Sequence, residues 1–220
     1  MMHKSIQNLI DVQKLINSKL VDLKNNKIPK IIAVSKTFNI DKILPLIEYG
    51  HLDYGENKVQ ETIDKWSDIK SKNQNIKLHL IGKLQTNKVK QAITIFDYIH
   101  SLDNQKLAKK IADEEKKQLK KIKLFIQVNI GSEPQKSGVN IENLDDLYKF
   151  STSLNLDIIG LMCIPPASED PQVYFQKLKA LNDKLGLKEL SMGMSSDYMV
   201  AIKNHATFVR VGSKIFGERI

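Results

Sequence analysis

Short apolar runs alternate with helix-sized segments along this 220-residue chain, and this alternation limits its possible folds more than any other feature. Eight runs have the length and the β-branched or aromatic residues that are typical of strands. They lie at residues 30–36, 52–54, 77–81, 98–99, 123–130, 158–162, 189–191 and 208–211. Because a helix-sized segment separates each run from the next, the pattern predicts an α/β fold, a (β/α)8 TIM barrel of parallel strands inside a ring of helices.

The segment before the first run predicts one extra, N-terminal helix. Ile6, Leu9, Ile16 and Leu20 recur there at helical spacing among charged residues. The other predicted helices lie between the strands, at 41–49, 57–65, 85–93, 105–119, 141–151, from 170 onward and at 196–204. An eight-stranded barrel of 220 residues leaves no room for a second domain, so we expect a single domain spanning residues 1–220.

The chain carries an excess of positive charge. Its 34 basic and 25 acidic residues give a net charge of +9, and all of the basic residues except Arg210 and Arg219 are lysines. The lysines are spread along the chain among acidic and apolar residues, as is typical of a solvated surface. Proteins that read nucleic acids usually carry arginine or aromatic side chains on a basic face, so we expect no nucleic-acid partner.

Membrane and metal partners find little support in the sequence. The longest apolar stretches, such as 31–34 and 161–164, are far shorter than the roughly 20 residues of a membrane-spanning helix. The N-terminal segment carries polar residues every few positions, unlike a secretory signal. Cys163 is the only cysteine, and the histidines have no companions at metal-ligand spacing. We therefore expect a cytoplasmic protein with no membrane partner and no metal.

One lysine stands at the end of the first predicted strand. Barrels of this kind build their active sites at the carboxyl ends of the strands, and Lys36 follows the apolar residues 31–34 at such an end. Partial burial there favours the neutral, nucleophilic amine, which can form a Schiff base with an aldehyde. The alternative is a lysine whose ammonium group extends into solvent.

Small hydroxyl residues and glycines follow the seventh and eighth strands. The segment Ser191 to Ser195 precedes a predicted helix, and Gly212-Ser213 follows the last strand. Such segments can bind a phosphate with backbone N–H groups at a helix N-terminus, or they can be ordinary turn and cap residues. Since the eighth strand of a closed barrel lies beside the first, a ligand with a phosphate and an aldehyde would reach both places. Pyridoxal 5′-phosphate has both groups.

Longer motifs are distributed along most of the chain. They are Ala33-Val34-Ser35-Lys36-Thr37, Tyr54-Gly55-Glu56-Asn57, His79-Leu80-Ile81-Gly82 with Leu84-Gln85-Thr86-Asn87-Lys88, Val128-Asn129-Ile130 with Lys136-Ser137-Gly138, Gly160-Leu161-Met162, Leu190 to Ser195, and Val209 to Gly217. In this order they resemble the motifs of the pyridoxal phosphate homeostasis proteins, single-domain relatives of the N-terminal barrel of alanine racemase.

The resemblance implies a set of cofactor-binding residues and no catalytic residue. They are Lys36 as the Schiff-base lysine that forms the internal aldimine, Asn57 as a contact beside the cofactor, Ser195, Gly212 and Ser213 as the phosphate cradle, Arg210 facing the pyridine nitrogen, His79 beneath or beside the ring, and Ser191 near the phosphate. Two of these have a simpler alternative, because His79 can be a packed core histidine and Ser191 can merely end its strand.

The chain departs from the resemblance at two positions. It has Asn204-His205-Ala206 where the family commonly has glycine before the last strand, and Lys58 where an aromatic residue often follows the Gly-Glu-Asn run. Asn can still take the left-handed conformation that ends a helix, so the departure at 204–206 concerns mainly the detail of that turn.

The resemblance implies a carrier role more than an enzymatic one. An arginine cannot give up its proton at ordinary pH, so it leaves the pyridine nitrogen unprotonated and the ring a weak electron sink. Racemases of this kind also use a tyrosine from a second domain, for which a chain that ends at Ile220 has no room. We expect a monomeric protein that binds pyridoxal phosphate, takes part in intracellular vitamin B6 homeostasis and hands the cofactor to apo enzymes.

Two other functions remain open from the sequence. One is weak racemisation or transamination of amino acids with Lys36 as the base. The other is a nucleic-acid or protein-binding module that uses the basic surface.

Overall fold

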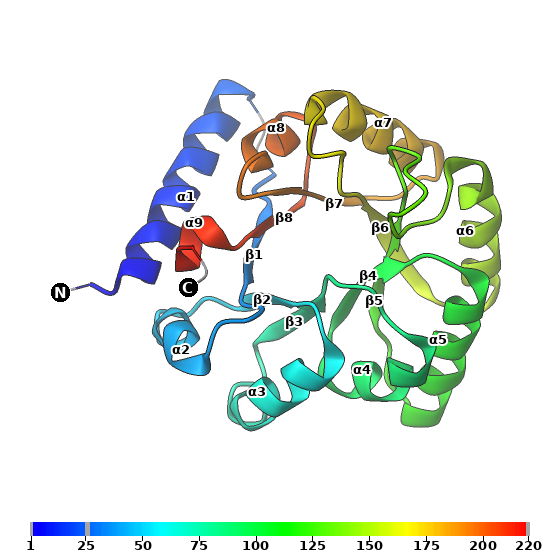
Figure 1. Cartoon of the computed structure of the whole chain (residues 1–220), viewed down its shortest axis with the longest axis horizontal. Helices are drawn as coiled ribbons and strands as arrows, with labels where there is room; N and C mark the ends of the chain where they lie inside the picture. The colour runs from blue at the N-terminus through cyan, green and yellow to red at the C-terminus, as the bar shows by residue number, and fades with distance from the viewer. Residues whose placement is uncertain (1, 25–26, 219–220) are drawn as a thin grey trace.

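A computed structural model describes residues 2–24 and 27–218. Eight parallel strands form a closed barrel in which each strand pairs with the next and β8 pairs with β1 (Figure 1). The strands are β1 (Lys30–Val34), β2 (Asp53–Glu56), β3 (Lys77–Leu80), β4 (Tyr98–Leu102), β5 (Lys123–Gln127), β6 (Asp157–Met162), β7 (Glu189–Met194) and β8 (Phe208–Val211). The predicted (β/α)8 barrel is therefore confirmed.

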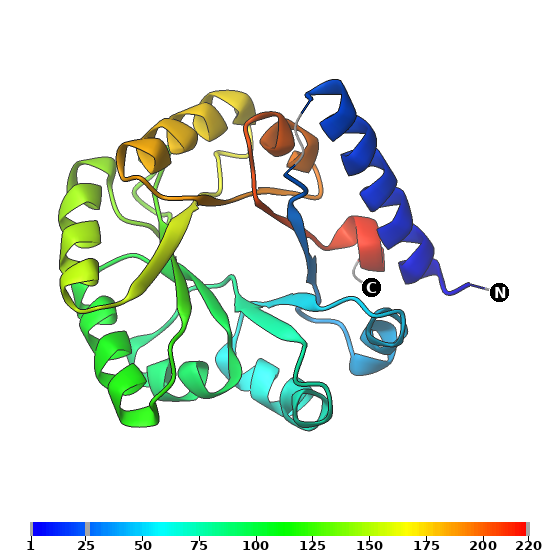
Figure 2. The ribbon, with the colours of Figure 1, turned by 180° about the vertical axis from the view of Figure 1, so that it is seen from behind.

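Helices surround the barrel on the outside (Figures 1 and 2). They are α1 (Lys4–Asp22), α2 (Ile40–Glu48), α3 (Val59–Lys72), η1 (Thr86–Lys88), α4 (Val89–Ile95), α5 (Gln105–Gln118), η2 (Ile141–Asn143), α6 (Leu144–Ser153), α7 (Pro171–Lys184), α8 (Tyr198–Lys203) and α9 (Ser213–Phe216). The predicted N-terminal helix is confirmed as α1. It lies beside α9, where the Asn8 side chain donates a hydrogen bond to the carbonyl oxygen of Ile215 (2.9 Å).

The strands divide the apolar core into two clusters. A large cluster packs between the strands and the helices, and a small cluster of Ile32, Tyr98, Phe125, Met162 and Phe208 fills the barrel interior. Successive side chains of a strand point to opposite faces. The barrel interior therefore receives alternate residues of each strand, and in several strands these inward residues are polar.

Several element ends differ from the sequence-based predictions. Strands β1 and β5 end earlier than predicted, at Val34 and Gln127, and β7 continues to Met194. Strand β4 continues to Leu102, beyond the predicted 98–99, because the polar side chains of His100 and Ser101 are buried in the sheet. After α8, the left-handed residue is His205 (φ 65°), whereas Asn204 has a φ of −101° and does not use the left-handed conformation open to asparagine. The described residues contain no helix with the length and apolar character to cross a membrane.

Candidate functional site

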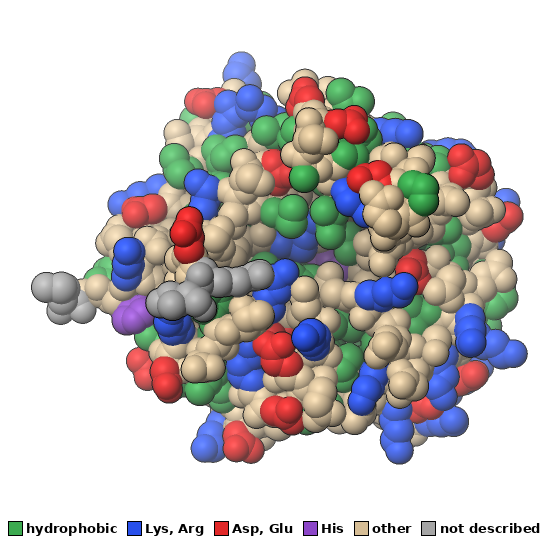
Figure 3. All heavy atoms as spheres, in the orientation of Figure 1, with side chains coloured by type: hydrophobic (Ala, Val, Ile, Leu, Met, Phe, Trp, Pro, Cys, Tyr) green, Lys and Arg blue, Asp and Glu red, His purple; other side chains and the backbone are tan. Residues whose placement is uncertain are grey.

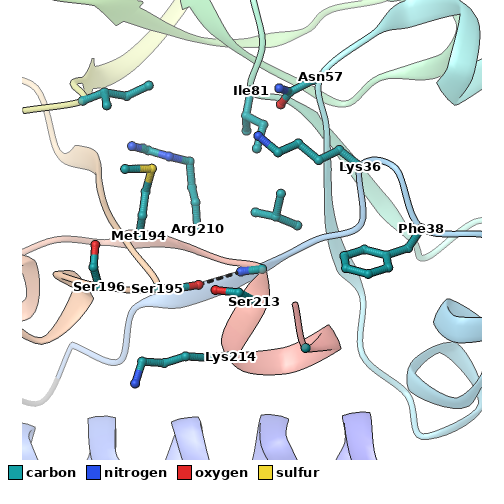
Figure 4. A pocket seen from close by; sticks show the side chains of 14 residues that line it. Lys36, Phe38, Asn57, Ile81, Met194, Ser195, Ser196, Arg210, Ser213 and Lys214 are labelled. Carbon is teal, nitrogen blue, oxygen red and sulfur yellow. Dashed lines mark hydrogen bonds between the residues drawn. The ribbon is translucent and has the colours of Figure 1, made fainter. Parts of the chain in front are cut away.

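A cavity of about 550 Å³ lies at the carboxyl ends of the strands next to the seam between β1 and β8. Its lining residues are Val34, Lys36, Phe38, Asn57, Ile81, Ile164, Met194, Ser195, Ser196, Arg210, Gly212, Ser213, Lys214 and Gly217. Six of the eight binding residues expected from the sequence are thus brought together. Lys36 and Arg210 reach into the cavity from opposite sides (Figure 4).

Lys36 belongs to a short loop that leaves β1 in a strained conformation. It is half-buried, and the next residue, Thr37, has a φ of 67°. Positive φ is uncommon for a β-branched residue, which is held there only when its surroundings dictate it. The Thr37 N–H donates to Glu61 Oε1 on α3 (2.9 Å), so one of these surrounding contacts comes from a helix.

A buried ion pair makes hydrogen bonds to the same loop. The carboxylate of Glu56 is fully buried and lies 2.8 Å from Lys65 Nζ, and the same Glu56 oxygen accepts a hydrogen bond from the Ser35 hydroxyl (2.7 Å). Lys65 Nζ also donates to the carbonyl oxygens of Ser35 (3.0 Å) and Phe38 (3.2 Å), on either side of Lys36. Charge-assisted hydrogen bonds of this kind are stronger than neutral ones. They fix where the backbone of Lys36 lies.

Asn57 is placed by a close backbone approach. A Cβ atom on Gly82 would lie 2.4 Å from the carbonyl oxygen of Asn57, so no larger residue fits at position 82 without movement. The turn after β3 therefore packs directly against the residue that follows β2. This contact holds Asn57 at the cavity, where its side chain lies near Lys36 and Ile81 (Figure 4).

Hydroxyl groups and backbone N–H groups form another side of the cavity. The N–H of Gly212 donates to Ser195 Oγ (3.1 Å), which joins the end of β7 to the end of β8 (Figure 4). Ser213 begins α9 directly after Gly212. Because the first N–H groups of a helix have no partner within the helix, this side of the cavity suits an anionic group.

Arg210 supplies the positive charge on the opposite side. Its side chain comes from β8 and the residue is 4% exposed. One guanidinium nitrogen donates to Ser191 Oγ (2.7 Å) and the other to the carbonyl oxygen of Cys163 (2.9 Å). Burial lowers the pKa of Arg210, yet arginine stays protonated in proteins. The guanidinium group therefore remains a donor at the cavity.

The two other expected binding residues lie beneath the cavity and do not line it. His79 and Ser191 are both fully buried in the barrel interior. His79 stacks on Tyr98 with ring centroids 4.3 Å apart, as in the alternative of a packed core histidine. Ser191 touches the site through its hydrogen bond with Arg210.

Sequence reasoning missed several residues of the site. His100, which has no companions in the sequence, contacts both His79 and Ser191 in the structure. Its position two residues after the inward-facing Tyr98 was the available signal. Nothing in the spacing pointed to the buried pair of Glu56 and Lys65, because its members belong to different elements.

Comparison with known proteins gives a consistent set of relatives. The family model described as "Alanine racemase, N-terminal domain" matches residues 15–220. The chain is 42% identical over 200 residues to the pyridoxal phosphate homeostasis protein of Aquifex aeolicus (strain VF5), covering 86% of this chain and 87% of that protein. It is 35% identical over 199 residues to the protein of the same name from Escherichia coli (strain K12), with coverages of 86% and 85%.

A solved structure is also similar. PipY of Synechococcus elongatus PCC7942, with pyridoxal phosphate bound, superposes with a TM-score of 0.80 at 31% identity. The match covers 92% of this chain and 100% of that chain.

Proposed function

We propose, because this chain belongs to the pyridoxal phosphate homeostasis protein family, that it binds pyridoxal 5′-phosphate in the cavity beside β1 and β8. The observation that carries the proposal is the arrangement of that cavity. An amine, a cradle of hydroxyl and N–H groups, and an obligate hydrogen-bond donor line one space of about 550 Å³, which is in the usual range for a small-molecule site. PipY, a relative of the same fold, has this cofactor in its structure.

Each group of the cofactor has a suitable partner among the lining residues. We assign the aldehyde carbon to Lys36 Nζ, the phosphate to Ser195, Gly212 and Ser213, and the pyridine nitrogen to Arg210, with Asn57 beside the ring. When bound, pyridoxal phosphate supplies an aldehyde that a neutral lysine amine attacks with loss of water. The loop around Lys36 orients this amine, and the cradle and Arg210 bind the opposite parts of the ligand.

The lining residues favour binding over amino-acid chemistry. Among the described residues that line the cavity, the ionisable ones are Lys36, Arg210 and Lys214. A guanidinium that only donates leaves the pyridine nitrogen unprotonated, so a negative charge beside the cofactor is poorly stabilised. No histidine, tyrosine, cysteine or carboxylate among these described residues offers a second acid or base. We therefore propose little or no enzymatic activity and a role in carrying the cofactor.

The alternative is a slow racemase or transaminase in which Lys36 is the base. The match to the alanine racemase N-terminal domain favours this alternative. We further propose that residues 1–220 act as one domain and as a monomer in the cytoplasm, and that apo forms of pyridoxal phosphate enzymes receive the cofactor.

The binding proposal is tested by spectroscopy of the purified protein. We expect a visible absorbance band from the lysine-bound cofactor that is lost on treatment with borohydride and is absent from Lys36→Ala. Peptide mapping of the reduced protein should then find the label on Lys36. Lys214→Ala is the matched control, because Lys214 lines the same cavity, and it should keep the band. A label on another lysine would overturn the assignment.

An assay with amino acids distinguishes the proposed carrier function from the enzymatic alternative. We expect the loaded protein to change neither the chirality nor the amino group of added L- or D-alanine at enzyme-like rates. Turnover that is lost in Lys36→Ala would instead support the enzymatic alternative.

A further inference from the structure

A line of hydrogen bonds runs through the barrel interior from the opposite end of the barrel to the cavity. Asp53 Oδ1, at the start of β2, lies 3.0 Å from His79 Nε2. His79 Nδ1 lies 3.0 Å from His100 Nε2, and His100 Nδ1 lies 2.8 Å from Ser191 Oγ. Ser191 Oγ accepts from Arg210 (2.7 Å), which lines the cavity.

The two ends of this line determine the direction of its outer bonds. Arginine can only donate hydrogen bonds, and an ionised carboxylate can only accept them. Burial raises the pKa of Asp53, but the hydrogen bond from His79 and the positive charge of Lys30 lower it, and the overall shift is downward, so the carboxylate is ionised. The Nε2 atom of His79 must therefore carry a proton and donate a hydrogen bond to Asp53.

The inner bonds follow from the neutral state of both histidines. Burial lowers the pKa of His79 and, even more, that of His100, so each ring carries a single N–H at neutral pH. Since the proton of His79 is on Nε2, its Nδ1 accepts from His100 Nε2. The Nδ1 atom of His100 then accepts a hydrogen bond from the Ser191 hydroxyl, and the lone pairs of Ser191 Oγ face Arg210. In each of the four hydrogen bonds, the donor is the group nearer Arg210 and the acceptor is the group nearer Asp53.

Aromatic rings enclose this line and restrict the rotation of the two imidazoles. Tyr98 stacks on His79 at 4.3 Å and Phe125 stacks on His100 at 4.3 Å, with interplanar angles of 11° and 19°. Phe208 lies 6.0 Å from both imidazole rings. Because packed rings keep the imidazoles in place, the hydrogen bonds cannot be exchanged by ring flips without opening the core.

Few charged or titratable groups among the described residues lie near the line. At the Asp53 end these are Lys30 on β1, with Nζ 4.0 Å from Asp53, the titratable His51 before β2, and Asp97 before β4. At the other end the charged groups are Arg210 and Asp197, whose negative charge opposes the lowering of the Arg210 pKa by burial. The two hydrogen-bond acceptors of Arg210, Ser191 Oγ and the Cys163 carbonyl oxygen, are uncharged. The carboxylate of Asp53 thus polarises the line from the far end, and the polarisation favours the guanidinium cation.

We propose that Asp53, His79 and His100 are positioning residues that act through Ser191 to hold the guanidinium of Arg210 in one orientation at the cavity. The line orients the Ser191 hydroxyl away from Arg210, so that a lone pair is always presented to it. The consequence for pyridoxal phosphate rests on the proposed function, whereas the direction of the hydrogen bonds does not.

The direction is tested on the protein without any cofactor. We expect long-range ¹H–¹⁵N spectra of histidine-labelled protein to report both His79 and His100 as neutral Nε2–H tautomers at pH 7 to 8. The signals of the exposed histidines His3 and His205 in the same spectra serve as the internal reference. An Nδ1–H tautomer or a cation at either buried ring at pH 7 would overturn the proposal, whatever the protein binds.

The link to Arg210 is tested with variants that remove one acceptor or donor. Ser191→Ala should weaken pyridoxal phosphate binding about tenfold or more, because a buried charged donor loses its partner. Asp53→Ala should weaken it about threefold and give a mixture of tautomers at His79, whereas Asp53→Asn keeps an acceptor oxygen and should stay close to wild type.

The matched control is Asp157→Ala, at the exposed start of β6 and outside the line, which should change neither binding nor the spectra. Wild-type affinity in both folded variants, Ser191→Ala and Asp53→Ala, would refute the positioning role. If either variant does not fold, the tautomers of the wild-type protein still decide the direction. If wild-type protein binds no pyridoxal phosphate, the proposed function fails while the tautomers remain a separate result.

Discussion

At the scale of single residues, the loop of Lys36 depends on a charge pair buried beneath it. Lys65 is bonded to the carboxylate of Glu56 and to two carbonyl oxygens of the loop, and its side chain is only 10% exposed. A buried ion pair contributes little beyond a well-packed apolar substitute, but removing one partner leaves an uncompensated buried charge. The position of Lys36 is thus sensitive to a residue that lies outside the cavity.

We expect Lys65→Met to lower the free energy of unfolding by about 3 kcal/mol, because the charge of Glu56 would lose its partner in the core. Urea denaturation followed by circular dichroism measures this. The control is Lys72→Met, an exposed lysine at the end of the same helix, which should be within about 0.5 kcal/mol of wild type. The double variant Lys65→Met with Glu56→Gln should recover part of the loss, and the absence of any recovery would argue against an unpaired charge as the cause.

At the scale of elements, the end of α8 forms a regular capping motif with an unusual residue. The N–H of Ala206 donates to the carbonyl of Ala201 (3.0 Å) and the N–H of His205 to that of Ile202 (3.1 Å). These two bonds define a Schellman motif, in which the left-handed position is usually glycine. His205 occupies that position with a φ of 65°. The motif forms without glycine, at a cost in backbone strain.

We expect His205→Gly to raise the free energy of unfolding by about 1 kcal/mol, because glycine adopts positive φ without the Cβ clash. Thermal unfolding of the two proteins measures the difference. His205→Ala removes the imidazole and retains the Cβ atom, so it should give little of this gain. Equal stabilisation by alanine and glycine would point to the imidazole and not to the backbone.

The elements also show where periodicity was a sufficient guide. The amphipathic pattern of residues 5–24 predicted α1 to within a few residues, and the Asp170-Pro171 start of α7 is present as a capped helix. The end of β4 could not be found in the same way, because His100 and Ser101 look like the start of a polar loop. They stay in the sheet because residues of other strands surround and bury their side chains.

At the scale of the whole molecule, the surface and the interior use charge differently. Lysine and arginine side chains are spread over the face in Figure 3 among acidic ones, which is the distribution that the sequence predicted for a solvated surface. The barrel interior holds the guanidinium of Arg210, the imidazoles of His79 and His100 and, at its edge, the carboxylate of Asp53. Because the structure lowers the pKa values of both histidines and of Asp53, these groups make the stability of the barrel depend on pH.

We expect the free energy of unfolding to decrease as the pH falls below about 6.5. Burial lowers the folded-state pKa of His51, His79 and His100, so the unfolded chain binds protons first as the pH drops through its own histidine pKa. Each such histidine contributes a loss of up to about 1.4 kcal/mol per pH unit until its folded-state pKa is reached. The lowered pKa of Asp53 extends the decline to more acidic pH.

Urea denaturation between pH 5 and 8 measures this dependence, with the curve flattest above pH 7. Stability that rises as the pH falls from 7 to 5 would contradict neutral, buried histidines.

The sequence by itself determined the eight β/α units and, from the strand ends, Lys36, Ser195, Gly212 and Ser213 of the cavity. Asn57 and Arg210 were implied by the family resemblance. The eight units and the four strand-end residues depend on local patterns, namely the period of the apolar residues and the rule that parallel strands end at one rim. Only the tertiary structure decided where His79, His100 and Ser191 lie. Closure of the barrel brings together residues 91 positions apart, such as His100 and Ser191. Their chemistry depends on contacts across the interior that no local pattern encodes.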